Sequence, residues 1–181
     1  MGCGCGGKKK GVQTLLAEAR EADGKPETWG PPLWAILHLL AERIGKSGTP
    51  FLDTDQARDM EVVISMLPLV IPCAECQAHC RAYLAKSPFT CIKLTGGDLS
   101  ACVRTWLLDF HNAVRSSNGQ AIEVADLEAL DAVYKDQTIQ SCQIESFGAN
   151  VLYGIRNGLV KMDSWKRWIA VYKRLKVLLG A

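Results

Sequence analysis

Apolar residues recur every three or four positions along most of the chain, which is the spacing of one buried face of an α-helix. This period predicts helices over residues 12–22, 29–44, 53–71, 72–85, 98–115, 126–134 and 164–179. The alternating pattern that is typical of β-strands never extends beyond a few residues. The sequence therefore predicts an all-α fold.

Three side chains are expected to mark helix boundaries. Asp53 and Gln56 have the spacing of a capping box at the start of one helix, and Asp98 is suited to cap the helix that follows it. Pro68 should kink or end the helix in which it lies. The segment 136–158 is only weakly periodic.

The last predicted helix, residues 164–179, has two contrasting faces. One face carries large apolar side chains, among them Trp165, Trp168 and Tyr172, and lysines and arginines surround this face. Such a helix is expected to pack on the rest of the fold. It could also extend a dimer interface, meet a partner or lie on a membrane surface, and the sequence leaves these alternatives open.

Composition and charge exclude several classes of function. A chain of 181 residues with 48% hydrophobic residues can form one core, and a formal net charge of +2 gives no reason to expect nucleic-acid binding. No apolar run approaches the ~20 residues that cross a bilayer, and we expect no secretory signal peptide because its hydrophobic segment is missing. Eight cysteines in such a chain favour redox or metal chemistry.

The first eleven residues are rich in glycine and lysine, so we expect them to be flexible. They could form a membrane anchor, with myristate on Gly2, palmitate on Cys3 or Cys5, and a lysine patch for anionic lipid. Alternatively, Cys3 and Cys5 form a mobile redox pair that carries electrons to a second cysteine pair. The third alternative is a solvated tail whose cysteines are incidental.

The clearest chemical motif is the segment Cys73-Ala74-Glu75-Cys76, which follows Pro72 and opens a predicted helix. Two cysteines three positions apart can close a small disulfide at a helix start. The partial positive charge of a helix N-terminus stabilises a thiolate, and a thiolate is the reacting species in thiol–disulfide exchange. We therefore predict a redox-active dithiol.

Two other interpretations compete with the redox one. Cys73, Cys76, His79 and Cys80 could hold structural zinc, but four ligands within eight residues would strain a helical turn and no second ligand pair follows. The cysteines could also serve as small buried hydrophobic residues. We predict no metal site.

Two predicted helices carry polar and aromatic side chains on one face. Trp34 and His38 are four residues apart, and so are His111 and Arg115, which places each pair on one face of its helix. Binding sites in helical bundles are built from such facing positions. Taken alone, His38 is more typical of a hydrogen-bonded core histidine.

Three segments together resemble the Erv/ALR family of FAD-linked sulfhydryl oxidases. Trp34–His38 is similar to the family pattern W-x-x-L-H, Pro72–His79 to P-C-x-x-C-x-x-H, and Trp106–Val114 to W-L-x-x-x-H-N-x-V. The order and spacing of the three segments agree with the family across residues 26–134. The likeness is greatest to the small versions that large DNA viruses encode.

The resemblance implies a four-helix bundle with a short fifth helix, which binds FAD at one end and usually forms a homodimer. Residues 26–135 would be this FAD-binding bundle, residues 1–25 a flexible tail with a short helix, and residues 136–181 a helical extension. Cys76 matches the cysteine beside the flavin, and Cys73 matches the cysteine that substrate thiolates attack. The implied FAD-binding residues are Gly30, Trp34, His38, His111, Asn112, Val114 and Arg115.

The sequence departs from the family at two informative positions. Arg115 stands where the family has asparagine, and its guanidinium could pair with the FAD pyrophosphate. Leu108 stands where the family has a structural cysteine, so Cys91, Cys102 and Cys142 either form a different disulfide or stay reduced.

The resemblance also implies a reaction. A substrate dithiol would reduce the Cys73–Cys76 disulfide, and electrons would pass through FAD to O₂ and yield H₂O₂. His79 could tune the pKa of the Cys76 thiolate, or it could be a core or dimer-interface histidine.

The expected partners and location follow from the same resemblance and from the N-terminal segment. We expect thiol-containing proteins and O₂ as partners, with no nucleic acid. The expected location is the cytoplasmic side of a membrane or a virion, with an N-terminal tether. The alternative function is a zinc-stabilised or membrane-tethered helical binding module without catalysis.

Overall fold

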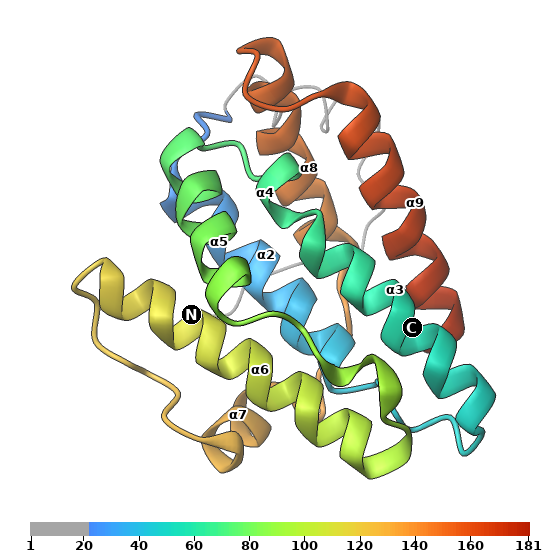
Figure 1. The fold of residues 1–181 in the computed structure, drawn as a ribbon. Helices are drawn as coiled ribbons and strands as arrows, with labels where there is room; N and C mark the ends of the chain where they lie inside the picture. The colour runs from blue at the N-terminus through green and yellow to red at the C-terminus, as the bar shows by residue number, and fades with distance from the viewer. Residues whose placement is uncertain (1–21) are drawn as a thin grey trace.

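The computed structural model describes residues 22–181, and within this range the regular elements are all helical (Figure 1). In chain order they are α2 (Pro26–Ala41), α3 (Pro50–Ser65), α4 (Leu67–Val70), α5 (Ala74–Lys86), the 3-10 helix η1 (Cys91–Lys93), α6 (Gly96–Ser117), α7 (Leu127–Tyr134), α8 (Ser141–Arg156) and α9 (Met162–Leu178). The predicted all-α fold is confirmed. The helix predicted from residue 12 onwards and the candidate residues Gly2, Cys3 and Cys5 lie outside the described residues.

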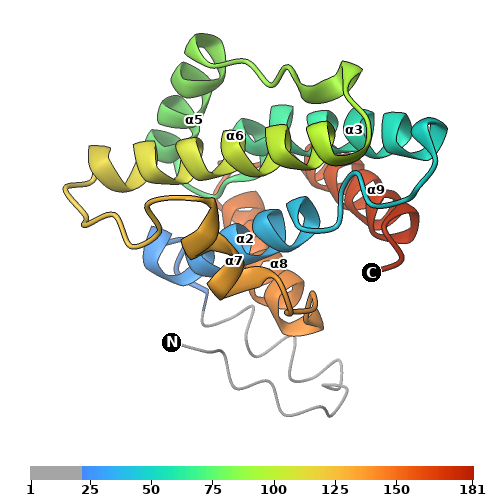
Figure 2. The ribbon, with the colours of Figure 1, turned by 90° about the horizontal axis from the view of Figure 1, so that it is seen from below.

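Helix α2 forms the centre of the molecule. Both α6 and α8 pack on it, and Figure 2 shows α6 in a layer above α2. The aliphatic side chains of Leu33, Ile36, Leu37 and Leu40 are almost completely buried as a result. The polar His38 is buried as well, because rings of α6 and α7 pack against it.

The predicted capping box at Asp53 and Gln56 is wrong. Helix α3 begins three residues earlier, after Thr49, because proline at position 50 has a fixed φ and no N–H, which suits the first helical position. Asp53 is buried and accepts hydrogen bonds from Ser47 Oγ at 2.6 Å and from Gly96 N at 2.7 Å. Its role is therefore to join the start of α6 to the loop before α3.

Gln56 has a similar tertiary role. Its side-chain oxygen accepts a hydrogen bond from Gly45 N at 3.1 Å, and its side-chain nitrogen donates to Leu178 O at 3.1 Å. These two bonds connect the loop after α2 with the end of α9.

The other two boundary predictions have different outcomes. Helix α6 begins at Gly96, so Asp98 lies in its first turn, where a carboxylate complements the helix dipole, and the prediction that Asp98 caps the helix is wrong. Pro68 does end a helix, as predicted. Helix α3 stops at Ser65, and Pro68 lies in the first turn of the short α4.

The C-terminal helices complete the core. Helix α8, in the segment whose periodicity is weak, packs along α2, and α9 packs along α3. Trp168 is completely buried and its Nε1 donates a hydrogen bond to Val63 O at 3.1 Å. Phe147 and Val151 of α8 are completely buried in the same core. Of the alternatives open for the last helix, packing on the bundle is therefore the arrangement that the structure shows.

Within residues 22–181, the structure also answers the question about the remaining cysteines. Cys91 and Cys102 form a disulfide that joins η1 to α6, while Cys142 lies in α8 and is not a free thiol. Cys80 is a free, buried thiol. In this part of the chain, no helix has both the length and the apolar character needed to cross a membrane.

Candidate redox and cofactor site

The predicted redox pair lies at the N-terminus of α5. Ile71 has the extended backbone that a following proline favours, and Cys73 occupies the N-cap position. Cys73 and Cys76 form a disulfide, and Cys73 Sγ accepts a hydrogen bond from Cys76 N at 3.2 Å. The helix N-terminus therefore points at the sulfur atoms, where its partial positive charge stabilises a thiolate.

Helix α5 presents different faces to the core and to solvent. Cys76, Cys80 and Tyr83 follow one another at spacings of four and three, so they share a face, and this face packs against the core. The opposite face is exposed and includes Glu75 and His79. His79 is therefore not a core histidine, while its predicted influence on the Cys76 thiolate stays a prediction.

A cluster of aromatic rings joins α2, α6 and α7. Trp34 stacks on His111, with ring centroids 4.1 Å apart and an interplanar angle of 8°. Tyr134 stacks on His38 with a centroid distance of 4.9 Å, and His38 Nε2 lies 3.1 Å from His111 Nδ1. We call Trp34, His38, His111 and Tyr134 the aromatic cluster.

The aromatic cluster is connected to α5 by further ring contacts. Phe110 of α6 meets Trp34 edge-on at 5.1 Å between centroids, and it stacks on Tyr83 of α5 at 4.6 Å. Tyr83 lies on the same face of α5 as Cys76. Packed rings thus extend from the helix that carries the redox disulfide to the pair of histidines.

Burial keeps both histidines uncharged. Desolvation, with a smaller contribution from His111, lowers the pKa of His38 to about 3. Desolvation, followed by the charge of Arg115, lowers the pKa of His111 to about 4, although Glu123 opposes the shift. At neutral pH each ring therefore has one N–H donor and one acceptor nitrogen.

One atom of the aromatic cluster has no partner. Among the described residues, His38 Nδ1 is a buried polar atom without a hydrogen bond. Since buried polar atoms are nearly always hydrogen-bonded, such an atom needs an explanation. Because His38 Nε2 is engaged with His111, the tautomer of that pair decides whether Nδ1 is a donor or an acceptor. His38 is thus a core histidine that is hydrogen-bonded at Nε2 and not at Nδ1.

The other predicted FAD-binding residues occupy different surroundings. Asn112 Nδ2 donates to Val124 O at 2.9 Å. Arg115 donates to Ala121 O and to Glu123 Oε1, each at 2.7 Å. Both side chains therefore bind the loop between α6 and α7.

The remaining predicted FAD-binding residues are Val114 and Gly30, which lie on α6 and α2 near the residues of the aromatic cluster. Val114 is partly buried and packs against the core. Gly30 is buried one turn before Trp34, and a Cβ there would meet no atom within 4 Å outside its own helix. The geometry thus brings Trp34, His38 and His111 together, and it does not bring Arg115 into ring contact with them.

Sequence reasoning missed two residues of the site, Tyr134 and Arg104. Arg104 Nε donates to Glu42 Oε1 at 2.7 Å, and its Nη2 donates to Asp131 Oδ1. Asp131 precedes Tyr134 by one turn on α7, and Glu42, the C-cap of α2, lies four residues after His38. Arg104 therefore holds α7 in the position where Tyr134 covers His38. Tyr134 could have been suspected as an aromatic residue on a short predicted helix, whereas no local pattern identifies Arg104.

No group of three or more His, Cys, Asp or Glu side chains within residues 22–181 is arranged to hold a metal ion. Cys73 and Cys76, two of the four ligands considered for zinc, are bonded to each other.

Comparisons with known proteins agree with the three motifs. The model of the Erv1 / Alr family matches residues 31–135. Protein 347L of Invertebrate iridescent virus 6 is 30% identical over 106 residues, which cover 55% of this chain and 87% of the viral protein. Protein 096R of Invertebrate iridescent virus 3 is 30% identical over 91 residues, which cover 50% of this chain and 56% of that protein. The names of both viral proteins place them among FAD-linked sulfhydryl oxidases.

A plant relative is more distant. The FAD-linked sulfhydryl oxidase ERV1 of Oryza sativa subsp. japonica is 26% identical over 110 residues, which cover 61% of this chain and 52% of the plant protein. The chain thus spans about half the length of two of these three relatives. No solved structure matches the chain significantly. Since the family model covers more than half of the chain and contains all three motifs, the chain belongs to the Erv1/Alr family.

Proposed function

We propose that the chain is an FAD-dependent thiol oxidase that forms disulfides in protein substrates. Electrons would pass from substrate thiols to the Cys73–Cys76 disulfide, then to FAD and finally to O₂, which yields H₂O₂. The observation that carries this proposal is the disulfide at the N-terminus of α5, on a helix whose inner face continues into packed aromatic rings. The relatives' names support the same activity.

The aromatic cluster fits FAD in two respects. Trp34 and His111 form a stacked pair of rings. An adenine ring could stack on such a pair. The unpartnered His38 Nδ1 could form a hydrogen bond to a ribose hydroxyl as a donor or an acceptor, because the ring is neutral. Trp34, His38, His111 and Tyr134 are therefore the residues that would hold the cofactor.

The structure gives less support for contact between Arg115 and the cofactor. Its guanidinium is bonded to the loop between α6 and α7, although a guanidinium can bind a phosphate oxygen with its remaining N–H groups. Contact between Arg115 and the pyrophosphate is therefore a prediction for binding measurements.

Thiol exchange would begin at Cys73. A substrate thiolate attacks Cys73 Sγ, the disulfide breaks, and Cys76 Sγ leaves as a thiolate that the N-terminus of α5 stabilises. A second substrate thiolate then attacks the substrate sulfur of the mixed disulfide and releases Cys73. Two electrons have then moved to the cysteine pair, and the substrate holds a new disulfide.

The next step belongs to the cofactor. FAD supplies a two-electron acceptor that can be reoxidised by O₂. The protein would hold Cys76 on the inner face of α5, where the surrounding side chains limit access of bulk water to its sulfur.

Assembly and location are also proposals. A homodimer rests on the family resemblance. A membrane tether through Gly2, Cys3 and Cys5, with association to a virion or the cytoplasmic side of a membrane, rests on the N-terminal sequence. A redox shuttle at Cys3 and Cys5 is the competing proposal for the same residues.

Oxygen uptake by the full-length protein tests the proposed activity. With dithiothreitol as substrate, the wild-type protein should consume O₂, and Cys76→Ser should abolish the uptake while it retains the flavin. A Cys76→Ser variant that oxidises thiols at the wild-type rate would contradict the assignment. A colourless wild-type protein that consumes no O₂ would favour the binding-module alternative.

A further inference from the structure

The C-terminal helices, which lie outside the three motif segments, contact the redox segment directly. Pro72, the residue before Cys73, packs directly on α8. A Cβ built on Gly154 would lie 2.9 Å from Pro72 Cβ and 3.2 Å from Pro72 Cα, which is closer than a side chain tolerates. The glycine at position 154 therefore permits a close approach between α8 and Pro72.

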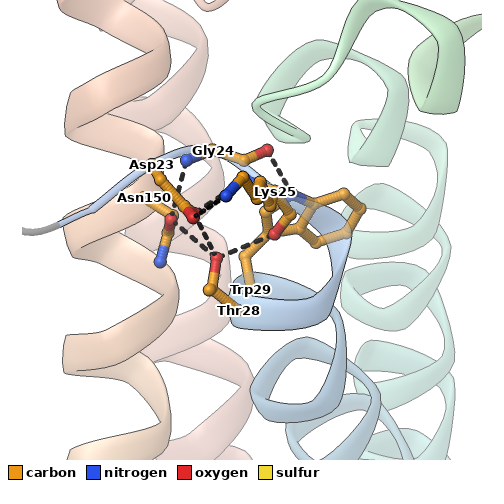
Figure 3. A network of polar contacts seen from close by, with 6 residues as sticks. All are labelled: Asp23, Gly24, Lys25, Thr28, Trp29 and Asn150. Atoms are coloured by element: carbon orange, nitrogen blue, oxygen red, sulfur yellow. Dashed lines mark hydrogen bonds and ion pairs between the residues drawn. The ribbon is translucent and has the colours of Figure 1, made fainter.

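The segment before α2 lies beside Pro72 as well. A Cβ on Gly24 would lie 2.6 Å from Tyr153 Cε1 and 3.3 Å from Pro72 O, and Gly24 has a φ of +70°, which side chains rarely adopt. Figure 3 shows how this segment is fixed to α8: Gly24 N donates to Asn150 Oδ1 at 3.2 Å, and Trp29 Nε1 donates to Gly24 O at 3.0 Å. Pro72 is thus in close contact with α8 and with a loop that α8 holds.

A third connection comes from α5 itself. Gln77, the residue after Cys76, donates from Nε2 to Ile71 O at 2.8 Å and to Leu159 O at 2.9 Å. Leu159 belongs to the turn between α8 and α9, and the adjacent Val160 is buried in the core. One side chain therefore ties the first turn of α5 to the residues before the redox pair and to the C-terminal helices.

We propose that α8 and the α8–α9 turn hold the backbone of residues 71–73 in place and thereby stabilise the oxidised form of the Cys73–Cys76 pair. Gly154 and Gln77 are the positioning residues. When both thiols are held at bonding distance, their effective concentration is high and the equilibrium favours the disulfide. When the backbone of Pro72 is displaced, the two thiols spend less time together and the disulfide is reduced more easily. This inference rests on the redox role proposed above.

Two alanine substitutions in α8 form a matched pair. Gly154→Ala forces Pro72 or Val160 to move, since the new Cβ would lie 2.9 Å and 3.1 Å from their side chains. Gly148→Ala adds the same methyl group to the same helix, but its Cβ would lie 3.4 Å from Trp165 Cζ2, an ordinary contact. Both variants gain similarly in helix propensity, so a difference between them reports the contact with Pro72.

A third variant tests the hydrogen bonds of α5. Gln77→Ala removes the bonds to Ile71 and Leu159 without adding an atom. It therefore decides the question if Gly154→Ala does not fold.

The measurement is an anaerobic redox titration of the full-length flavin-containing protein in mixtures of reduced and oxidised dithiothreitol. Two electrons and two protons pass from dithiothreitol to the disulfide, which gives two cysteine thiols and cyclic oxidised dithiothreitol. Free thiols are trapped with a maleimide, and the peptide that contains Cys73 and Cys76 is quantified by mass spectrometry. The equilibrium constant for reduction should rise about tenfold in Gly154→Ala, a change of about 30 mV in the reduction potential.

The other two variants have expected equilibrium constants as well. Gln77→Ala should raise the equilibrium constant about threefold, and Gly148→Ala should leave it at the wild-type value. Wild-type constants in both Gly154→Ala and Gln77→Ala would overturn the proposal, as would a rise of equal size in Gly148→Ala. The titration requires no O₂ and no turnover, so a protein without oxidase activity would still yield these constants.

Discussion

The two disulfides within residues 22–181 differ in their surroundings. Cys73 and Cys76 are both half-buried, and the disulfide that joins them lies at the N-terminus of α5. Cys91 is completely buried, and it is bonded to the partly buried Cys102, which joins η1 to the interior of α6 and not to a helix N-terminus. Exchange requires an approaching thiolate and a stabilised leaving thiolate. Access and local charge therefore favour a reactive role for Cys73–Cys76 and a structural role for Cys91–Cys102.

The largest expected effect comes from removal of the Cys73–Cys76 pair. Cys73→Ser with Cys76→Ser should reduce dithiothreitol-dependent O₂ uptake at least about 10³-fold, since the electron entry point is lost. The far-ultraviolet circular dichroism should not change, because the disulfide spans a single turn. Residual uptake above one tenth of the wild-type rate would show that electrons enter elsewhere.

Cys80, a free thiol on the inner face of α5, should react more slowly than an exposed thiol. Burial raises the pKa of Cys80 to about 12, so its thiolate fraction at pH 8 is about 10³-fold lower than that of an ordinary thiol with a pKa near 9. Iodoacetamide should therefore modify Cys80 at least that much more slowly than an exposed cysteine introduced by Ala82→Cys on the same helix. The Cys80 rate should increase with pH until the thiol ionises, and equal rates at pH 8 would contradict the assigned burial.

Removal of the Cys91–Cys102 disulfide should affect stability rather than turnover. Cys91→Ser with Cys102→Ser opens a loop with a sequence separation of 11, which should lower the free energy of unfolding by about 3 kcal/mol. Urea denaturation of both proteins without reductant measures this difference. The rate of O₂ uptake at 25 °C should stay within about twofold of the wild-type rate. A loss of activity as large as that of the Cys73/Cys76 variant would remove the distinction between the two disulfides.

The last of these effects concerns stability at low pH, and it comes from His38 and His111 of the aromatic cluster. Their pKa values, about 3 for His38 and about 4 for His111, lie below the value of about 6.5 in the unfolded chain. Below pH 6.5 the unfolded chain therefore binds more protons, and stability decreases from pH 6.5 towards pH 4. Each of the two histidines accounts for a loss of up to about 3 kcal/mol over this range.

Variants can assign this pH dependence to the aromatic cluster. In urea denaturation across this pH range, the His38→Gln/His111→Gln variant should lose less stability than the wild-type protein. The exposed His79→Gln serves as the control and should retain the wild-type profile. Equal profiles for all three proteins would mean that the two histidines are already charged in the folded protein.

The sequence predicts those parts of the site that depend on local spacing. The cysteine pair after Pro72 begins a helix, and the four-residue spacing places Trp34 and His38 on one face, because a helical period acts within one segment. The same reasoning failed for Asp53 and Gln56. Their side chains bind partners in other segments, and a local capping pattern cannot reveal such partners.

Contacts between distant segments account for what was missed. Tyr134 covers His38 at the place where Arg104 of α6 binds both Asp131 of α7 and Glu42 at the end of α2. Gly154 looked like one of several glycines in a weakly periodic segment, yet it allows α8 to approach Pro72. In both cases the role of a residue depends on which helix packs beside it, and one sequence does not determine that choice.

The most direct test of the central claim is the visible absorption spectrum of the purified full-length protein during anaerobic addition of dithiothreitol. The wild-type protein should be yellow, and its flavin band should bleach as the thiol is added and return when air is admitted. The Cys73→Ser/Cys76→Ser variant should keep the band and resist bleaching. A colourless protein, or a flavin band that bleaches equally fast without the cysteine pair, would contradict the proposal that electrons reach FAD through Cys73 and Cys76.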